Sequence, residues 1–272
     1  AGLIRQLLPD PSDKEMLESQ ILFDIANKPY PSHRPFRSPH HSISLTGLVG
    51  GTRHATPGEI SLAHHGILFL DELPEFSLAT IEALRQPLEA GHIQITRAEQ
   101  SHLYPAKFQL IAAMNPCPCG YRGSSETACR CSSSALTRYD AKLSGPLLDR
   151  IDMFIRVSRS KLSDVMAPQT TQYDRLERVR QSVLVARESQ IVRQGQQNSL
   201  LPSSDVLDSC SLTGETKKWL ESTGERLKLS GRSLHRCLRV ARTIADLTGA
   251  ASVSQTDLTE ALAYRIAIKA NP

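Results

Sequence analysis

Gly66-Ile67-Leu68-Phe69-Leu70-Asp71-Glu72-Leu73 is the stretch of the sequence that decides the fold. Four bulky apolar residues in succession predict a central strand buried on both faces, and parallel α/β sheets bind ligands where such strands end. At that point Asp71 can hold Mg²⁺, and Glu72 can deprotonate a water that attacks a phosphate. A strand that ends in a solvated acidic turn fits the same letters equally well. The stretch therefore predicts an α/β fold and leaves the role of its acids open.

Helix, hairpin and strand signals surround this central strand. A capping box followed by apolar residues every four positions predicts a helix over about 13–26, and a second helix is expected over about 77–90. Five prolines make the stretch 29–58 an expected long loop rather than a regular element. The remaining expectations are a projecting hairpin over about 92–105 and a second buried strand over 108–114.

The character of the chain changes near residue 157. Residues 158–272 show helical periodicity with little strand signal, whereas residues 1–157 alternate strands and helices. One apolar stripe consists of Leu234, Leu238, Ala241 and Ala245. We therefore expect an α/β domain over 1–157, followed by an all-α domain over 158–272.

Composition describes a soluble globular protein and excludes few functions. The 272 residues carry a net charge of +4, with 22% charged and 40% hydrophobic residues. This charge permits a polyanionic partner without requiring one, because nucleic-acid binding depends on where positive charges cluster. No apolar run approaches the roughly 20 residues needed to cross a bilayer, and the start lacks a signal peptide's zones. We expect a cytoplasmic protein that does not contact a membrane.

Two further positions are candidate catalytic residues. Asn115 follows the expected strand 108–114, so its amide should lie beside Asp71 if the two strands are neighbours. The alternative is a turn-forming Asn before Pro116. Arg150 follows a Gly-Pro turn, and a guanidinium supplied across a subunit boundary stabilises charge on a transferring phosphoryl group. A surface ion pair with a neighbouring aspartate is the alternative for Arg150.

Basic residues recur in the helical half and near the hairpin. Arg232, Arg236 and Arg239 share one helix face, and this stripe either reaches a phosphate or is simply solvated. Arg97 and His102 lie near the turn of the expected hairpin. In a ring of subunits such hairpins could touch a nucleic-acid backbone, whereas an ordinary surface hairpin is the plainer interpretation.

Four of the six cysteines lie within 15 positions of one another. Cys117 and Cys119 form one close pair, and Cys129 and Cys131 form another. Four thiolates can close a tetrahedral Zn²⁺ site, although the spacing departs from the usual C-x₂-C. Reduced thiols, a redox pair or another soft metal are the alternatives. Zinc is the preferred interpretation.

Other cysteines and histidines are interpreted as structural. Cys210 and Cys237 fall in helical patterns and are expected in the core. The pairs 40–41 and 64–65 are histidines with no carboxylate or cysteine at ligand spacing, so we expect hydrogen-bonding roles for them.

Taken in order, several segments resemble the magnesium-chelatase-like family of AAA+ ATPases, and especially its competence-protein branch. The resemblance covers nearly the whole chain. The segments that carry it are Arg34–His41, Pro57–His64, Leu70–Glu75, Asn115–Gly120, Ser144–Arg150 and Val240–Leu247.

The resemblance implies a role for each candidate. Asp71 and Glu72 match the Walker B acids, which bind Mg²⁺ and activate water, and Asn115 matches sensor 1. Arg150 matches the arginine finger, and either Arg232 or Arg239 matches sensor 2, an ATP-contacting residue. The fold implied is an AAA+ parallel-sheet subdomain followed by a helical lid. The implied assembly is a ring, expected to be a hexamer, whose hairpins project into the channel.

The activity implied is ATP-driven movement on single-stranded or branched DNA, namely branch migration during natural transformation. Two alternatives stay open: a motor subunit that drives metal insertion into a porphyrin, and a non-catalytic zinc-bearing module for assembly or DNA binding. No G-x-x-x-x-G-K-[ST] motif occurs in the 272 residues. Because that loop supplies most of the grip on a nucleotide, this chain alone is expected to bind ATP poorly.

In family members the phosphate-binding loop lies just upstream of the matching segment, and a Lon-like amino-terminal domain lies further upstream. The expected explanation for the missing motif is therefore that the chain is a fragment. A natural pseudo-ATPase is the alternative.

Overall fold

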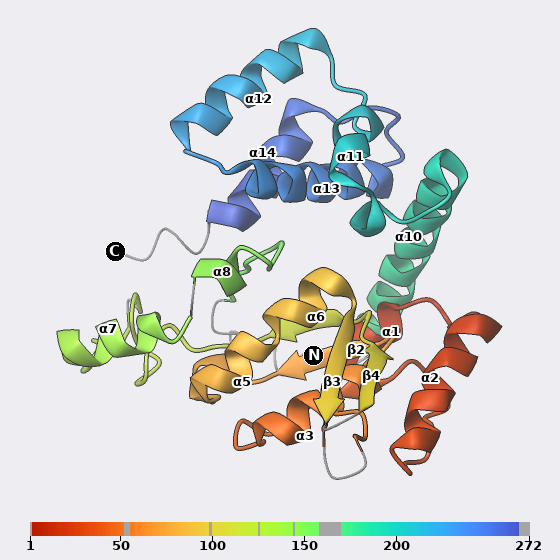
Figure 1. The fold of residues 1–272 in the computed structure, drawn as a ribbon. Coiled ribbons are helices and arrows are strands. Elements are labelled where there is room, and N and C mark those ends of the chain that lie inside the picture. Colours follow the sequence, from red (N-terminus) through yellow and green to blue (C-terminus); the bar gives the residue numbers. More distant parts are fainter. Residues whose placement is uncertain are drawn as a thin grey trace. The chain divides into compact units, whose positions relative to one another are not determined.

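The computed structural model describes residues 2–51, 55–97, 100–124, 126–143, 145–157 and 170–266. The chain divides into two compact units, residues 1–150 and 151–272 (Figure 1). The first unit is mixed α/β, and the described part of the second is helical. A mixed α/β fold with a small parallel sheet is thus confirmed, whereas the domain boundary at residue 157 stays a prediction.

The first unit contains a three-stranded sheet, a two-stranded hairpin and short helices. Its helices are α1 (Gly2–Leu7), α2 (Asp13–Ile25), α3 (Leu45–Val49), α4 (Glu59–Leu62), η1 (Leu73–Glu75), α5 (Leu78–Ala83), α6 (Arg85–Ala90), α7 (Ser133–Ala141) and α8 (Gly145–Leu148). Its strands are β1 (Phe36–Arg37), β2 (Ile67–Leu70), β3 (His92–Arg97), β4 (Gln100–Pro105) and β5 (Gln109–Ala112).

The sheet is parallel, with the strand order β1-β2-β5. The central strand β2 is the stretch quoted first, and three of its four residues are buried. β5 was expected to be buried as well, but Gln109 and Ala112 are exposed because β5 borders the sheet that the described residues form. β1 lies within the stretch expected to be a loop. Gly66 permits its approach, because a Cβ there would lie 2.0 Å from the Pro35 carbonyl oxygen.

The helix expected over 77–90 is two helices that meet at Leu84. Pro87 explains the break, because a proline ring clashes with the carbonyl four residues earlier, and α5 ends at that residue, Ala83. α2 has the expected capping box, with the Ser12 amide donating to the Glu15 carboxylate at 2.9 Å. Its apolar stripe, however, is exposed rather than buried, at Leu17 60%, Ile21 50% and Ile25 45%.

The hairpin of β3 and β4 is antiparallel as expected. It is also anchored in the core, because Ile93, Ile95 and Tyr104 are buried there. The Tyr104 hydroxyl donates a hydrogen bond to the Ala55 carbonyl at 2.8 Å.

The second unit is built around α13. Its helices are α10 (Thr170–Gln194), η2 (Asn198–Leu200), α11 (Ser203–Ser209), α12 (Gly214–Arg226), α13 (Gly231–Leu247) and α14 (Gln255–Ile266). The predicted stripe on α13 is confirmed for Leu238, Ala241 and Ala245, which are fully buried, and Cys210 and Cys237 are buried as expected. None of the described helices is both long and apolar enough to span a membrane.

Two charged residues of α13 are also buried. Arg242 is 0% exposed and pairs with Asp246, whose carboxylate also accepts hydrogen bonds from Arg193 and Asn198. Moving a charged group from water into the protein interior is costly unless other groups hydrogen-bond to it. The hydrogen bonds just described compensate the charges of Arg242 and Asp246. This network therefore fixes how α10, η2 and α13 pack together.

Candidate functional site

Polar side chains follow the carboxyl ends of the two long parallel strands. β2 and β5 are paired, with Leu70 opposite Ala112. Ala113 continues the pairing through backbone hydrogen bonds to Leu70 (2.9 Å) and Leu73 (3.0 Å). Asp71–Glu72 lies between these two bonds, and Asn115 follows two residues later. The structure therefore places both acids and the amide at one edge of one sheet.

Glu72 has an unusual backbone conformation. Its φ is 51° and its ψ is 45°, in the left-handed region that a residue other than glycine rarely adopts. Such conformations are costly and persist where surrounding structure enforces them. The Glu72 amide donates to the Asp71 carboxylate at 2.9 Å, and both side chains are exposed. Both carboxylates can therefore be reached by a ligand from solvent.

His41 also reaches this edge, which the sequence did not indicate. It lies in the loop that follows β1, and its Nδ1 is 3.3 Å from Glu72 Oε2. Its ring is tilted against that of His40, with the centroids 4.0 Å apart, and meets Phe76 edge-on at 6.4 Å. Recognising β1 would have supplied the missing signal, because the carboxyl ends of adjacent parallel strands share one edge of the sheet.

Asn115 is held through its backbone. Its carbonyl accepts a hydrogen bond from the Tyr139 hydroxyl of α7 at 3.0 Å, and its side chain is exposed. Burial, with a smaller contribution from nearby Glu75, raises the pKa of Tyr139 to about 12. Tyr139 therefore remains a hydrogen-bond donor at any physiological pH.

Arg150 is engaged within its own chain. Its guanidinium donates to the Pro146 carbonyl at 2.7 Å and to the Glu89 carboxylate of α6. The side chain is 13% exposed and lines a hollow together with Arg85 and Glu89. These two contacts are with α8 and α6 rather than with the acids after β2.

The arginines of α13 differ in their surroundings. Arg232 is exposed near the start of the helix. Arg239 is partly buried and donates to the Leu201 carbonyl at 2.7 Å, while Arg236 pairs with Asp152 at 2.5 Å. Burial, followed by the nearby positive charge of Arg236, lowers the pKa of Arg239. Of the two sensor 2 candidates, Arg232 is thus the one exposed to solvent.

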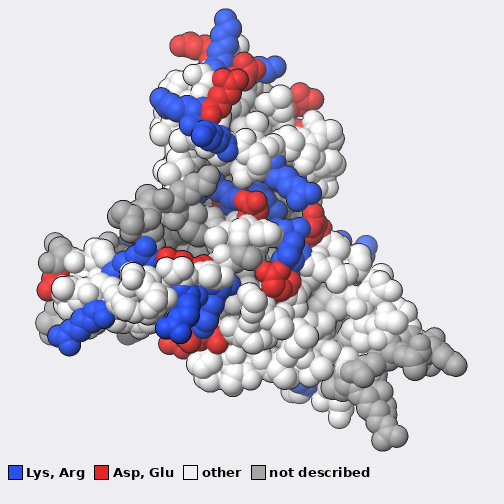
Figure 2. Space-filling model, turned by 60° about the vertical axis from the view of Figure 1, so that its left-hand side comes forward, with Lys and Arg blue, Asp and Glu red and all other residues white. Residues whose placement is uncertain are grey.

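Arg97 and His102 are the two basic residues expected near the turn of the hairpin. The side chain of Arg97 lies outside the described part of the structure, and the ring of His102 stacks on Tyr104 at 6.2 Å. On the face drawn in Figure 2, lysine and arginine side chains alternate with aspartate and glutamate. The described part of that face is therefore of mixed charge rather than uniformly basic.

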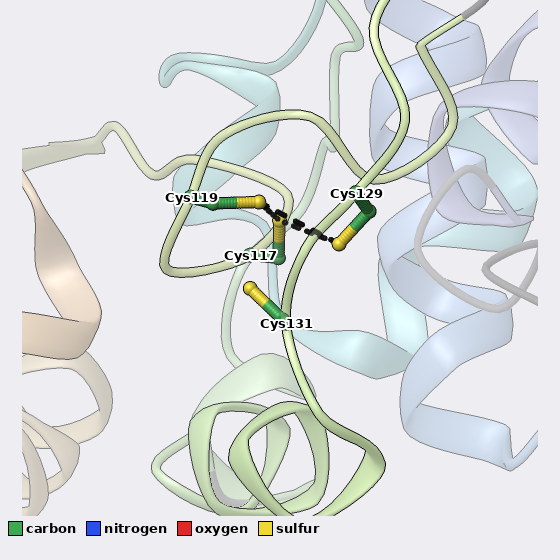
Figure 3. A group of neighbouring side chains, drawn as sticks. All are labelled: Cys117, Cys119, Cys129 and Cys131. Carbon is green, nitrogen blue, oxygen red and sulfur yellow. Dashed lines mark hydrogen bonds between the residues drawn. The ribbon is translucent and has the colours of Figure 1, made fainter.

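The four cysteines between residues 117 and 131 converge and are called the cysteine cluster below (Figure 3). The Sγ atoms of Cys117, Cys119 and Cys129 are 3.4 to 3.7 Å apart, and all four lie within 4.8 Å of one another. A tetrahedral zinc site with Zn–S bonds of about 2.3 Å places its sulfurs about 3.8 Å apart. The geometry of the cluster therefore fits a closed zinc site.

Turns and backbone amides shape this cluster. Gly120, with a φ of 79°, closes a turn by donating its amide to the Cys117 carbonyl at 2.9 Å. The Arg122 amide donates to Cys117 Sγ at 3.3 Å. Hydrogen bonds from the backbone amides of Arg130 and then Tyr121 lower the pKa of Cys119 to about 6. These donors favour the thiolate of Cys119, the form that binds metal, whereas burial and the neighbouring thiols raise the pKa of Cys129 and of Cys131.

A second group of metal-ligand types, Glu18, His64 and His65, is called the histidine cluster below. Glu18 comes from α2 and lies 2.7 Å from His65 Nε2 and 3.4 Å from His64 Nε2. The Lys107 amide donates to His64 Nδ1 at 3.0 Å, so the proton of neutral His64 is on Nε2. That nitrogen has no lone pair for a metal. The side chains of the histidine cluster are therefore arranged for hydrogen bonding with one another rather than for binding a metal. Its carboxylate, Glu18, lies 46 residues before His64 in the sequence.

Sequence comparisons agree with this architecture. The family model described as magnesium chelatase, subunit ChlI, matches residues 1–165, and the model of that subunit's C-terminal region matches residues 174–265. Uncharacterized protein YifB of Escherichia coli is 44% identical over 273 residues, which is 97% of this chain and 53% of that protein. Competence protein ComM of Haemophilus influenzae is 42% identical over 279 residues, which is 99% of this chain and 53% of that protein.

YifB of Salmonella typhimurium is similar to the same extent, at 43% identity over 270 residues. The chain spans about half the length of these curated relatives. The family models together cover most of the chain, and both units have a match of their own. The chain thus belongs to the magnesium chelatase subunit ChlI family, an AAA+-like family of motor proteins.

Proposed function

We propose that this chain is the greater part of an ATPase module in a ring-shaped DNA motor that drives branch migration. The observation that carries the proposal is the pairing of β2 with β5, which gathers Asp71, Glu72 and Asn115 at one sheet edge. Ligands of parallel α/β sheets bind at this edge. The name of the similar competence protein supports a role in the uptake or integration of DNA.

Each residue of the edge suits one task of ATP hydrolysis. Asp71 offers carboxylate oxygens to Mg²⁺, which when bound to ATP neutralises charge on the phosphates. Glu72 is the proposed base that takes the proton of the attacking water, and Asn115 the group that orients that water. The strained backbone of Glu72 supports this assignment, because functional sites concentrate such conformations.

Two arginines complete the proposal. Arg150 is assigned to stabilise the transferring phosphoryl group of a neighbouring subunit, as the ring assembly requires. In that assembly its guanidinium exchanges the Glu89 carboxylate for phosphate oxygens. Arg232 is preferred over Arg239 as the phosphate-contacting residue of the helical unit, because Arg239 already binds the Leu201 carbonyl.

The cysteine cluster is assigned to a structural zinc ion. A closed site with four protein ligands leaves no position for substrate, which separates this metal from the chemistry at the sheet edge. The 272 residues contain no G-x-x-x-x-G-K-[ST] motif, so we propose that they hydrolyse no ATP by themselves.

The test is an ATPase assay on the longest native polypeptide that contains these residues. DNA should stimulate hydrolysis, and Glu72→Gln should lower the rate by about 10²-fold or more. Asp24→Asn, at an exposed acid of α2, is the matched control and should leave the rate nearly unchanged. A DNA-independent rate, or an undiminished rate in Glu72→Gln, contradicts the proposal.

A chelatase motor is the second candidate, because the matching family models are described by magnesium chelatase. Such a subunit would hydrolyse ATP without a response to DNA and would depend on porphyrin-handling partners. The same assay with and without branched DNA therefore separates the two motors. A non-catalytic zinc-bearing module would give no hydrolysis in either arm.

A further inference from the structure

Helix α7 is held in place by few apolar contacts. Of its residues Ser133–Ala141, only Tyr139 is buried. In Figure 1 the helix projects away from the labelled strands of its unit. Helices of globular proteins gain most of their stability by packing an apolar face, which α7 hardly does. Other interactions must therefore determine where it lies.

Polar contacts tie α7 to the sheet edge and to the cysteine loop. Tyr139 donates its hydroxyl hydrogen to the Asn115 carbonyl at 3.0 Å. Asp140 accepts from the guanidinium of Arg122 at 2.9 and 3.2 Å. Lys142, just beyond the helix, lies 3.9 Å from Glu75. The Arg122 contact reaches the segment 117–131 that the cysteine cluster closes, and the Tyr139 contact reaches Asn115 just before that segment.

The cysteine cluster joins both ends of that segment. Cys117 lies two residues after Asn115, and Cys131 immediately precedes Ser132, which caps α7. Arg122 links the cluster to the helix directly, because its amide donates to Cys117 Sγ while its guanidinium pairs with Asp140. Gathering the four sulfurs therefore brings the start of α7 back to the residue that follows β5.

We propose that the metal-loaded cysteine cluster is a clamp that positions Asn115 through α7, with Tyr139 as the positioning residue. The inference rests on the proposed function, which gives Asn115 its role. Without metal, only weak hydrogen bonds between the thiols join the sulfurs, and the loop opens. α7 then loses its anchor, and the Asn115 backbone loses the Tyr139 hydrogen bond. Metal supply would in this way control the order of the catalytic edge.

Hydrogen exchange followed by mass spectrometry tests the clamp on the 272-residue chain, without nucleotide or DNA. Removing zinc with a chelator should speed exchange in residues 113–116 and 133–141 by at least about tenfold. Segments 67–70 and 231–247 are internal controls and should change little. Equal protection with and without zinc, or a chain that binds no zinc, overturns the proposal.

Tyr139→Phe separates positioning from folding, since it removes one hydroxyl and keeps the buried ring. We expect zinc content to stay at that of the wild type and exchange at 113–116 to rise about fivefold. Thr137→Val, at an exposed position of the same helix, is the matched control and should leave this exchange unchanged. Unchanged exchange in Tyr139→Phe refutes the positioning role, even if the ATPase assay supports the proposed function. If the ATPase assay fails, faster exchange in Tyr139→Phe still shows that Tyr139 orders the residues after β5.

Discussion

The cysteine cluster and the histidine cluster each gather metal-ligand side chains within 4.8 Å, yet only one of them suits a metal. Around the cysteines, backbone amides donate to the sulfurs of Cys117 and Cys119, and at Cys119 they favour the charged thiolate. Around the histidines, the Lys107 amide occupies the acceptor nitrogen of His64 and fixes the proton on the other one. Proximity of ligands is therefore not enough, because the surrounding hydrogen bonds decide which protonation state is available.

The histidine cluster and the cysteine cluster also differ in what stabilises them. His64 is 1% exposed, and its burial, with a smaller effect of neighbouring His65, lowers its pKa to about 4. A neutral, hydrogen-bonded imidazole stabilises the fold at the junction of α2, α4 and β5. The cysteine cluster instead lies on a loop with few apolar contacts, where a metal can supply the stability that a hydrophobic core cannot.

The largest expected effect is on zinc content. Wild-type chain should bind about one equivalent of zinc, and Cys119→Ala should reduce this to almost none, because three thiolates no longer close the site. Cys237→Ala makes the same change at a buried cysteine outside the cluster and should keep the full equivalent. Plasma mass spectrometry of purified protein measures both. His65→Ala should also keep the full equivalent of zinc. If this variant loses zinc, the histidine cluster is the site that binds the metal.

Local sequence signals predicted much of the structure that carries these clusters. The capping box of α2, the buried strand β2, the β3–β4 hairpin and the core stripe of α13 follow from short-range patterns, and the structure confirms them. These elements depend on periodicity and capping, which neighbouring residues encode. The grouping of four cysteines within 15 positions is likewise visible in the sequence.

The features that were missed depend on contacts between distant residues. β1 is two residues long and forms only because β2 offers it a parallel partner. Without β1, nothing in the sequence places His41 beside Glu72. The same holds for Glu18, which meets the histidine pair across 46 residues, and for the apolar stripe of α2, whose exposure no local pattern reveals. The catalytic roles of the edge residues and of Arg150 stay predictions.

The second expected effect is a dependence of stability on pH caused by His64. Its pKa is about 4 in the folded chain, against about 6.5 for a histidine exposed to water, so the unfolded chain binds more protons between these limits. Stability should therefore fall as the pH drops from about 6.5 to 4, by roughly 3 kcal/mol in total.

Urea unfolding followed by circular dichroism at several pH values measures this slope. His64→Gln should flatten it, because the amide accepts from Lys107 and donates to Glu18 without titrating. His33→Gln, at an exposed histidine, is the matched control and should keep the wild-type slope. An unchanged slope in His64→Gln would mean that His64 is not the buried neutral group described here.

The smallest effect is expected for Glu18→Gln. Glu18 bonds to His65 at 2.7 Å, and this hydrogen bond lowers its pKa, yet its side chain is 40% exposed. Solvent screens such a pair, so the substitution should cost less than about 1 kcal/mol of unfolding free energy at neutral pH. Glu15→Gln is the matched comparison on the same helix and should cost more, because it leaves Arg34, 7% exposed, without its carboxylate. If Glu18→Gln costs as much as Glu15→Gln and releases bound metal, the histidine cluster holds an ion after all, and the argument from the Lys107 amide fails.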